Sequence, residues 1–301
     1  MDGVLSSQNA QIHDQSPNKY VKLEKISTQA ATPSAQSLEN AKYNLKQGYP
    51  KLQSLPEFRK VKGRDKKIAL IGGGPSINNY IDDIKQFKTT IACGSSNDWM
   101  MNNGIIPTYA AICDPDSISI NYYNKTDTEV KYLIASCCDP KIFEHLKDRQ
   151  IVLWHCHSDE IGEKLKELEP GYEAVGGGCT VGLRALSIAI MMGYNNIHFF
   201  GFDSCLGVND QHHAYDFSTD IEELGQIYSI KIGDENILKD NAKEYRCAGY
   251  QLAQAHHFKE FYRHYNLYFI PTFYGDGLIS ATMNFINEEI TRLNQEKVGV
   301  N

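Results

Sequence analysis

From residue 66 onward the sequence repeats one unit, a short apolar run followed by a helix-like segment and then the next apolar run. These runs are continuous rather than alternating, which is typical of strands in a parallel sheet covered on both faces. Repeated strand–helix units predict a doubly wound, mostly parallel α/β fold of the Rossmann type. Because ligands of such folds bind at the carboxyl ends of the strands, residues that directly follow an apolar run are the candidates for a site.

The apolar periodicity predicts the individual elements. We expect strands at Lys67–Ile71, Thr89–Cys93, Tyr109–Cys113, Val130–Ser136, Gln150–His155, Asn196–Gly201 and Leu267–Pro271. We expect helices at Ser76–Gln86, Asn97–Asn103, Ser117–Asn124, Lys141–Leu146, Thr180–Met192 and Tyr250–Tyr265.

Two parts of the chain depart from this repeat. Residues 1–64 are rich in Ser, Gln and Asn, and we predict a flexible or helical extension with a short helix near Ser37–Gln47. Residues 65–301 are predicted to form one Rossmann-like domain. Within it, the polar and irregular segment 206–244 is predicted to be a lid or insertion over the site.

Charge and hydropathy exclude some classes of protein. The formal net charge is −7, which argues against a nucleic-acid partner held by a broad basic face. No apolar run is long enough to span a bilayer, so no transmembrane segment is predicted. The amino-terminal residues lack the charged-then-apolar order of a signal peptide, and we expect a cytoplasmic protein. These properties do not determine the oligomeric state, and a homo-oligomer is possible.

The eight cysteines lie in or beside apolar segments and form no CxxC pair, so reduced thiols are expected. Cys156 lies between His155 and His157, which raises the alternative of a zinc site. Adjacent residues of a strand point to opposite faces, however, and this argues against all three binding one ion.

A glycine-rich corner follows the first predicted strand. It consists of Gly72, Gly73, Gly74, Pro75 and Ser76. Glycines let the backbone turn sharply and approach a ligand, and proline suits the first turn of a helix. The N–H groups at such a helix start favour a phosphate. The pattern is neither a Walker A loop nor GxGxxG. The alternative is a plain strand-to-helix turn.

A second glycine run, which includes Gly177 and Gly178, precedes Cys179 and Thr180 at the start of another predicted helix. It predicts a second helix amino-terminus able to bind an anion. Ser95, Ser96 and Asn97 follow the second strand and offer hydroxyl and amide groups for a base or ribose.

Carboxylates follow two further strands. Asp114 and Asp116 flank a proline after the third strand, where they could share Mg²⁺ or Mn²⁺ on a diphosphate. The alternative is a helix cap, and both roles are compatible, with Asp114 functional and Asp116 capping. Asp203 follows the strand that ends at Gly201, and His212 and His213 lie in the polar loop beyond it. Each of these three residues is a candidate for the catalytic base. For Asp203, the alternative to a catalytic role is that its side chain only stabilises a turn.

The order of these motifs resembles that of a known family. GGGPS after the first strand resembles the GxGPS corner of small bacterial sialyltransferases. It also resembles that of the hydroxymethylpterin diphosphokinase-like proteins and motility accessory factors. The block GGGCTVGLRALSIAIMMGYNNIHFFGFDSC resembles their shared helix–strand–Gly–x–Asp segment. The resemblance covers roughly residues 66–216.

The resemblance implies a nucleotide-binding transferase. By position, the nucleotide would be bound by Gly72, Gly74, Ser76, Asn97, Gly178 and Thr180. Asp114 and Asp203 would orient metal or acceptor. His213 would be the base. Our leading hypothesis is a glycosyltransferase that uses a CMP-sugar-type donor, with a glycan, a protein or a small molecule as acceptor. The alternatives are a Mg²⁺-dependent diphosphokinase that transfers diphosphate from ATP to a pterin-like alcohol, and a non-catalytic nucleotide-binding module.

Overall fold

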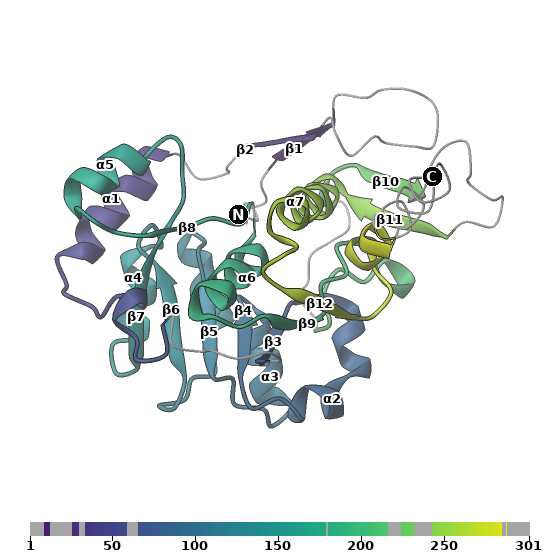
Figure 1. The fold of residues 1–301 in the computed structure, drawn as a ribbon, viewed down its shortest axis with the longest axis horizontal. Helices are drawn as coiled ribbons and strands as arrows, with labels where there is room; N and C mark the ends of the chain where they lie inside the picture. Colours follow the sequence, from purple (N-terminus) through teal and green to yellow (C-terminus); the bar gives the residue numbers. More distant parts are fainter. Residues whose placement is uncertain are drawn as a thin grey trace, which may run out of the picture.

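The computed structural model of the chain describes residues 9–12, 26–29, 34–58, 66–178, 180–215, 224–231, 243–284 and 287. Its centre is an eight-stranded sheet in the order β12-β9-β3-β4-β5-β6-β7-β8, in which every neighbouring pair is parallel. Helices flank this sheet, α6 against β3, β4 and β5, and α3 against β4 (Figure 1). The predicted doubly wound α/β fold is confirmed.

The strands of the central sheet are β3 Lys67–Ile71, β4 Thr90–Cys93, β5 Tyr109–Ile112, β6 Lys131–Ala135, β7 Gln150–Cys156, β8 Ala174–Val175, β9 Asn196–Phe200 and β12 Ile270–Tyr274. The longer helices are α1 Ser34–Leu45, α6 Val181–Met192 and α7 Gly249–Tyr265. The shorter ones are α2 Ile81–Lys85, α3 Ser96–Asn102, α4 Pro140–His145 and α5 Gly162–Leu168. The described residues also form four 3₁₀ turns: η1 Leu52–Ser54, η2 Pro75–Asn79, η3 Ser117–Tyr122 and η4 Val208–Asp210.

The strand order places a topological switch point between β3 and β9. The chain runs from β3 outward to β8 and then returns to place β9 on the other side of β3. Helices of the outward and return paths lie on opposite faces, because crossovers between parallel strands are right-handed. A crevice therefore opens at the carboxyl ends of β3 and β9, where the glycine corner and the Gly201–Asp203 turn meet.

The core explains why the strand sequences are continuous apolar runs. Ile68, Ala69, Leu70 and Ile71 of β3 are fully buried, as expected for a strand covered on both faces. Small side chains on α6, such as Ala185 and Ala189, are also fully buried and let that helix lie close to the sheet.

Several predicted elements differ from those observed. The segment predicted as one helix, Ser76–Gln86, is η2 followed by α2, because Tyr80 between them has non-helical angles (φ −126°, ψ 22°). The segment Ser117–Asn124 holds a 3₁₀ turn, and the last strand, β12, begins three residues later than Leu267.

The sequence patterns also missed some elements. The two-residue strand β8 and helix α5 were not expected, nor were two antiparallel pairs outside the central sheet. One pairs β1 Asn9–Ile12 with β2 Ile26–Gln29, and both strands contact α7. The other pairs β10 Ile227–Lys231 with β11 Glu244–Ala248, so β10 lies in the segment predicted as a lid or insertion. None of the described helices has the length and apolar character that crossing a bilayer requires.

Candidate functional site

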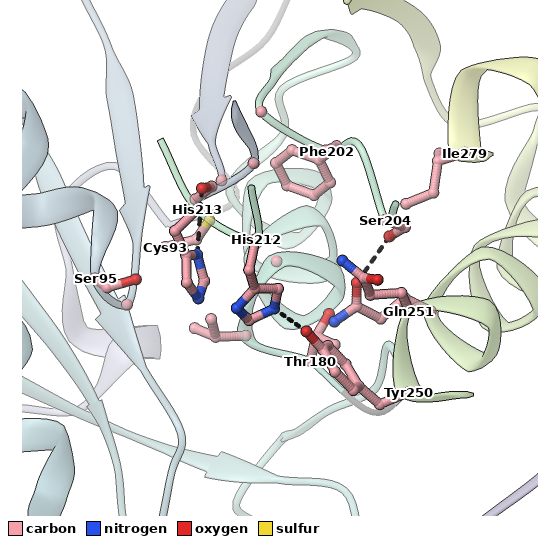
Figure 2. Close-up of a pocket in the computed structure, with 18 of the residues that line it drawn as sticks. Cys93, Ser95, Thr180, Phe202, Ser204, His212, His213, Tyr250, Gln251 and Ile279 are labelled. Carbon is pink, nitrogen blue, oxygen red and sulfur yellow. Dashed lines mark hydrogen bonds between the residues drawn. The ribbon is translucent and has the colours of Figure 1, made fainter. Parts of the chain in front are cut away.

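A cavity of about 350 Å³ lies at the switch point. The carboxyl ends of β3, β4, β5 and β9, the start of α6 and the start of α7 all contribute to its wall. Eight of the predicted site residues line it: Gly72, Gly73, Gly74, Ser95, Asp114, Thr180, His212 and His213. Figure 2 shows the two histidines between Ser95 on one side and Tyr250 with Thr180 on the other.

The other predicted residues do not line this cavity. Asp116 caps η3, accepting a hydrogen bond from Ile118 N at 2.9 Å. Ser96 and Asn97 are fully buried beneath the wall, where Ser96 Oγ donates to Ile71 O at 2.6 Å. Pro75, Ser76, Gly177, Gly178 and Asp203 also lie outside the lining, and Cys179 is outside the described residues.

The glycine corner is tied mainly to the protein itself. Gly72 N donates to Phe200 O at 2.8 Å and Gly74 N to Gly201 O at 2.9 Å. Ser76 N donates to the carboxylate of Asp203 at 2.8 Å. A Cβ at Gly74 would come within 2.6 Å of that carboxylate. Gly72 and Gly74 therefore let the tips of β3 and β9 lie close to each other. Of the N–H groups in this corner that were predicted to bind a phosphate, we retain that of Gly73 as the candidate.

The start of α6 is the better anion site. Thr180 is its cap, and Thr180 Oγ1 accepts a hydrogen bond from Leu183 N at 3.4 Å. The preceding N–H groups belong to Val181 and Gly182, which line the cavity and cannot bond within the helix. The positive end of the dipole of this helix therefore lies at the cavity wall. Arg184, by contrast, donates to the carbonyl oxygens of Val175 and His157, away from the cavity.

His213 lies against the glycine corner. Its Nδ1 is 3.3 Å from Gly73 O, and Gly73 O also accepts from Ala214 N at 3.0 Å. Since a carbonyl oxygen can only accept, the contact assigns the proton of the neutral ring to Nδ1 and the lone pair to Nε2. Burial lowers the pKa of His213, so the imidazole is neutral at pH 7. A ring held in this way suits a general base.

His212 lies beside it, with ring centroids 4.0 Å apart. Its Nε2 contacts the hydroxyl of Tyr250, and its buried Nδ1 has no partner in the described part of the chain. Burial, with a smaller contribution from His213, lowers the pKa of His212 to about 3. The contact with Tyr250 joins the loop that carries both histidines to the start of α7.

Sequence reasoning missed part of the wall. Tyr250, Gln251 and Gln254 of α7 line the cavity together with Ser204 and Tyr122. Ser204 Oγ donates to Gln254 Oε1 at 2.7 Å. Burial and the charges of Asp114 and Asp116 raise the pKa of Tyr122 to about 12, so its hydroxyl keeps its proton. The polar residues at the start of the predicted helix Tyr250–Tyr265 were the available signal, but nothing local shows that this helix returns to the switch point.

Among the described residues, the cavity wall carries few of the charged groups that bind highly charged ligands. No Lys or Arg occurs among the described residues that line the cavity, and Asp114 is the one carboxylate there. No group of three or more His, Cys, Asp or Glu side chains that could hold a metal is found in the described residues. Because Asp116 caps η3, the predicted carboxylate pair does not face the cavity together and fits Mg²⁺ poorly.

Comparison with known proteins places the chain in a family. The model of the family described as 6-hydroxymethylpterin diphosphokinase MptE-like matches residues 35–209, more than half of the chain. The chain belongs to this family. The resemblance stated from the motifs is thereby confirmed. A comparison with curated proteins found no match.

The fold has counterparts among solved structures. The MAf glycosyltransferase from Magnetospirillum magneticum AMB-1 superimposes with a TM-score of 0.60 at 15% identity, over 81% of this chain and 36% of that one. This chain thus spans just over a third of that protein's length, and the likeness concerns the fold. A mammalian sialyltransferase gives a TM-score of 0.38 at 12% identity, over 62% of this chain and 72% of that one. Sialyltransferase Cst-I of Campylobacter jejuni gives 0.33 at 16%, over 72% and 78%. These two scores are too low to add to the argument.

Proposed function

We propose that this protein is a glycosyltransferase that uses a nucleotide-activated sugar of the CMP-sugar type, with His213 as the base. The observation that carries the proposal is the pairing of a neutral, partly buried histidine with a helix amino-terminus across one cavity. The histidine suits deprotonation of an acceptor hydroxyl, and the helix start suits the phosphate that leaves.

In the proposed reaction an acceptor hydroxyl attacks the anomeric carbon of the donor sugar. Nε2 of His213 takes the hydroxyl proton as the new C–O bond forms. The bond between the anomeric carbon and the phosphate oxygen breaks, and the nucleotide leaves. The N–H groups of Gly73, Val181 and Gly182 would stabilise the negative charge on the leaving phosphate.

The charge of the wall favours this chemistry over diphosphate transfer. A triphosphate donor needs its developing charge neutralised by Lys, Arg and Mg²⁺. The described lining has no Lys or Arg. A single phosphate held by backbone N–H groups needs less positive charge.

The family match supports a second candidate, a diphosphokinase that transfers diphosphate from ATP to an alcohol. The description of the matching family names such an enzyme, and Asp114 faces the cavity. This candidate requires Mg²⁺ and the release of AMP from ATP.

The first test is thermal shift of the full chain against CMP, CDP, UDP, GDP, ATP and the corresponding sugars, with and without Mg²⁺. A ligand that binds the native state raises the melting temperature by mass action. We expect a shift with a nucleotide or its sugar that does not need Mg²⁺. A shift only with ATP and Mg²⁺, followed by AMP release, would replace the glycosyltransferase with the diphosphokinase. No shift with any of these ligands would contradict both.

The second test compares His213→Asn with His264→Gln, a change at an exposed histidine of α7. We expect His213→Asn to bind the donor and lose hydrolysis or transfer by about 10²-fold or more. His264→Gln should retain both. Full turnover in His213→Asn would show that this histidine is not the base.

A further inference from the structure

Three cysteines gather behind the cavity, at the carboxyl ends of three neighbouring strands. Cys113 follows β5, Cys137 follows β6 and Cys156 ends β7. The sulfur atoms of Cys137 and Cys156 are 3.9 Å apart, and Cys137 Sγ also lies 3.5 Å from Cys113 O. Cys113 lines the cavity, so a small molecule inside the cavity lies next to this cluster.

The strand register explains why two of these sulfurs meet. Ala135 of β6 pairs with Trp154 of β7, and Ser136 N donates to Trp154 O at 2.7 Å. The ladder therefore continues past the formal end of β6 and brings Cys137 to the level of Cys156. Neighbouring strands lie about 4.8 Å apart, which is within the Cα separation of about 4.4–6.8 Å that a disulfide spans.

The register does not align Cys113 with Cys156 in this way. β6 separates β5 from β7, so the ideal sheet spacing puts the α-carbons of the two cysteines about 10 Å apart, although the S–H group of Cys113 contacts the sulfur of Cys156. Cys138 is next to Cys137 in sequence, but its sulfur lies 3.7 Å from Ile112 O, under the sheet.

The neighbours of Cys156 favour its thiolate form. The S–H groups of Cys113 and Cys137 and the positive charge of Arg184 lower the pKa of Cys156. The zinc alternative does not apply here, because His155 contacts Ser136 Oγ at 2.8 Å and Glu169 Oε2 at 2.9 Å instead. Cys156 is also partly exposed, whereas Cys137 is buried.

We propose that Cys156 is a redox-reactive thiol that forms a reversible disulfide with Cys137, in the wall behind the cavity. The oxidant is hydrogen peroxide. The Cys156 thiol releases its proton, and the thiolate attacks one peroxide oxygen. The O–O bond breaks, the departing hydroxide takes up the released proton, and a sulfenic acid and one water result. The sulfur of Cys137 then attacks the sulfenic sulfur, the S–O bond breaks, and its thiol proton leaves with the oxygen as a second water. Two thiols are oxidised by two electrons in total, and the peroxide is reduced to two waters.

The test treats the folded full chain with stoichiometric hydrogen peroxide, blocks the remaining thiols and digests with trypsin without reduction. Trypsin places Cys137 and Cys138 in the peptide 132–141, Cys156 in 150–164, and Cys93 with Cys113 in 89–125. We expect a cross-link between 132–141 and 150–164 that dithiothreitol reverses. It should persist in Cys138→Ser and vanish in Cys137→Ser and in Cys156→Ser.

Cys93 is the control for an unreactive buried thiol, because burial raises its pKa to about 12. At pH 7 we expect iodoacetamide to label Cys156 roughly tenfold or more faster than Cys93 in the folded protein. Equal labelling rates would overturn the proposal. So would a cross-link within 132–141 or to 89–125, or irreversible oxidation of Cys156 without a disulfide. Circular dichroism of each variant shows that its result comes from a folded chain.

Discussion

The carboxylate of Asp203 holds Ser76 from across the switch point. Oδ2 accepts the N–H of Ser76 at 2.8 Å, and Oδ1 accepts its hydroxyl at 2.5 Å. The two residues are 127 positions apart in the sequence. This carboxylate therefore occupies the start of η2, where the sequence predicts a phosphate, and it ties the tip of β9 to the tip of β3.

Asp203→Ala should destabilise the fold more than Asp203→Asn. Alanine leaves the N–H and hydroxyl of Ser76 without their acceptor, at a cost of about 1–3 kcal/mol in the free energy of unfolding. Asparagine keeps one acceptor oxygen and removes a carboxylate whose pKa is raised by burial, so its cost should be smaller. Urea unfolding of both variants measures the difference. Equal losses would mean that the contact with Ser76 contributes little.

Gly74→Ala should be strongly destabilising. The added Cβ would lie 2.6 Å from Asp203 Oδ2 and 2.7 Å from Gly201 O, so the two strand tips must separate. Such overpacking costs about 1–3 kcal/mol. The matched control is Gly176→Ala, where nothing lies within 4 Å of the new Cβ. Melting temperatures of the two variants check this, and similar values would contradict the close approach of β3 and β9.

Stability should fall as the pH drops below about 6.5. Burial lowers the pKa of His212 to about 3. Burial, together with the charges of His256 and Arg184, lowers the pKa of His257 to about 4. Burial also lowers the pKa of His213. A histidine with a lowered folded-state pKa binds protons more readily when unfolded. Its contribution is therefore complete above the unfolded value and is lost as the pH falls toward the folded value.

The measurement is the melting temperature between pH 7.5 and 5, above the range where most carboxylates titrate. Asp203 works in the opposite direction, since its raised pKa means that protonation favours the folded state. We expect a net decline that is shallower in His257→Gln. An unchanged slope in that variant would indicate that His257 titrates in the same way folded and unfolded.

Thr180→Ala should weaken the start of α6. It removes the oxygen that accepts from Leu183 N, and the loss of such a cap costs about 1 kcal/mol. Thr180→Ser keeps the hydroxyl and should stay within a few tenths of a kcal/mol of the wild type. Chemical denaturation compares the two. If serine costs as much as alanine, the methyl group rather than the cap stabilises this turn.

Local pattern was sufficient for the fold class and for eight of the residues that line the cavity. Continuous apolar runs identify β3, β4, β5, β6, β7 and β9, because burial on both faces leaves no alternation. The residues that follow these runs meet at one edge of the sheet, which is why Gly73, Ser95, Asp114 and His213 line one cavity. The break at Tyr80, between η2 and α2, and the late start of β12 could not be predicted from the sequence. The ends of helices and strands depend on contacts with residues distant in the chain.

The sequence by itself determined which residues directly follow the strands of the central sheet, because the position of a strand and the period of its apolar pattern are local properties. Only the tertiary structure decided what each residue does there. It pairs Asp203 with Ser76, Asp116 with η3 and Arg184 with two carbonyl oxygens. It also brings Tyr250 to the cavity wall and Cys156 next to Cys137. These partners are distant in the chain, and their pairing depends on three-dimensional register, which no one-dimensional pattern records.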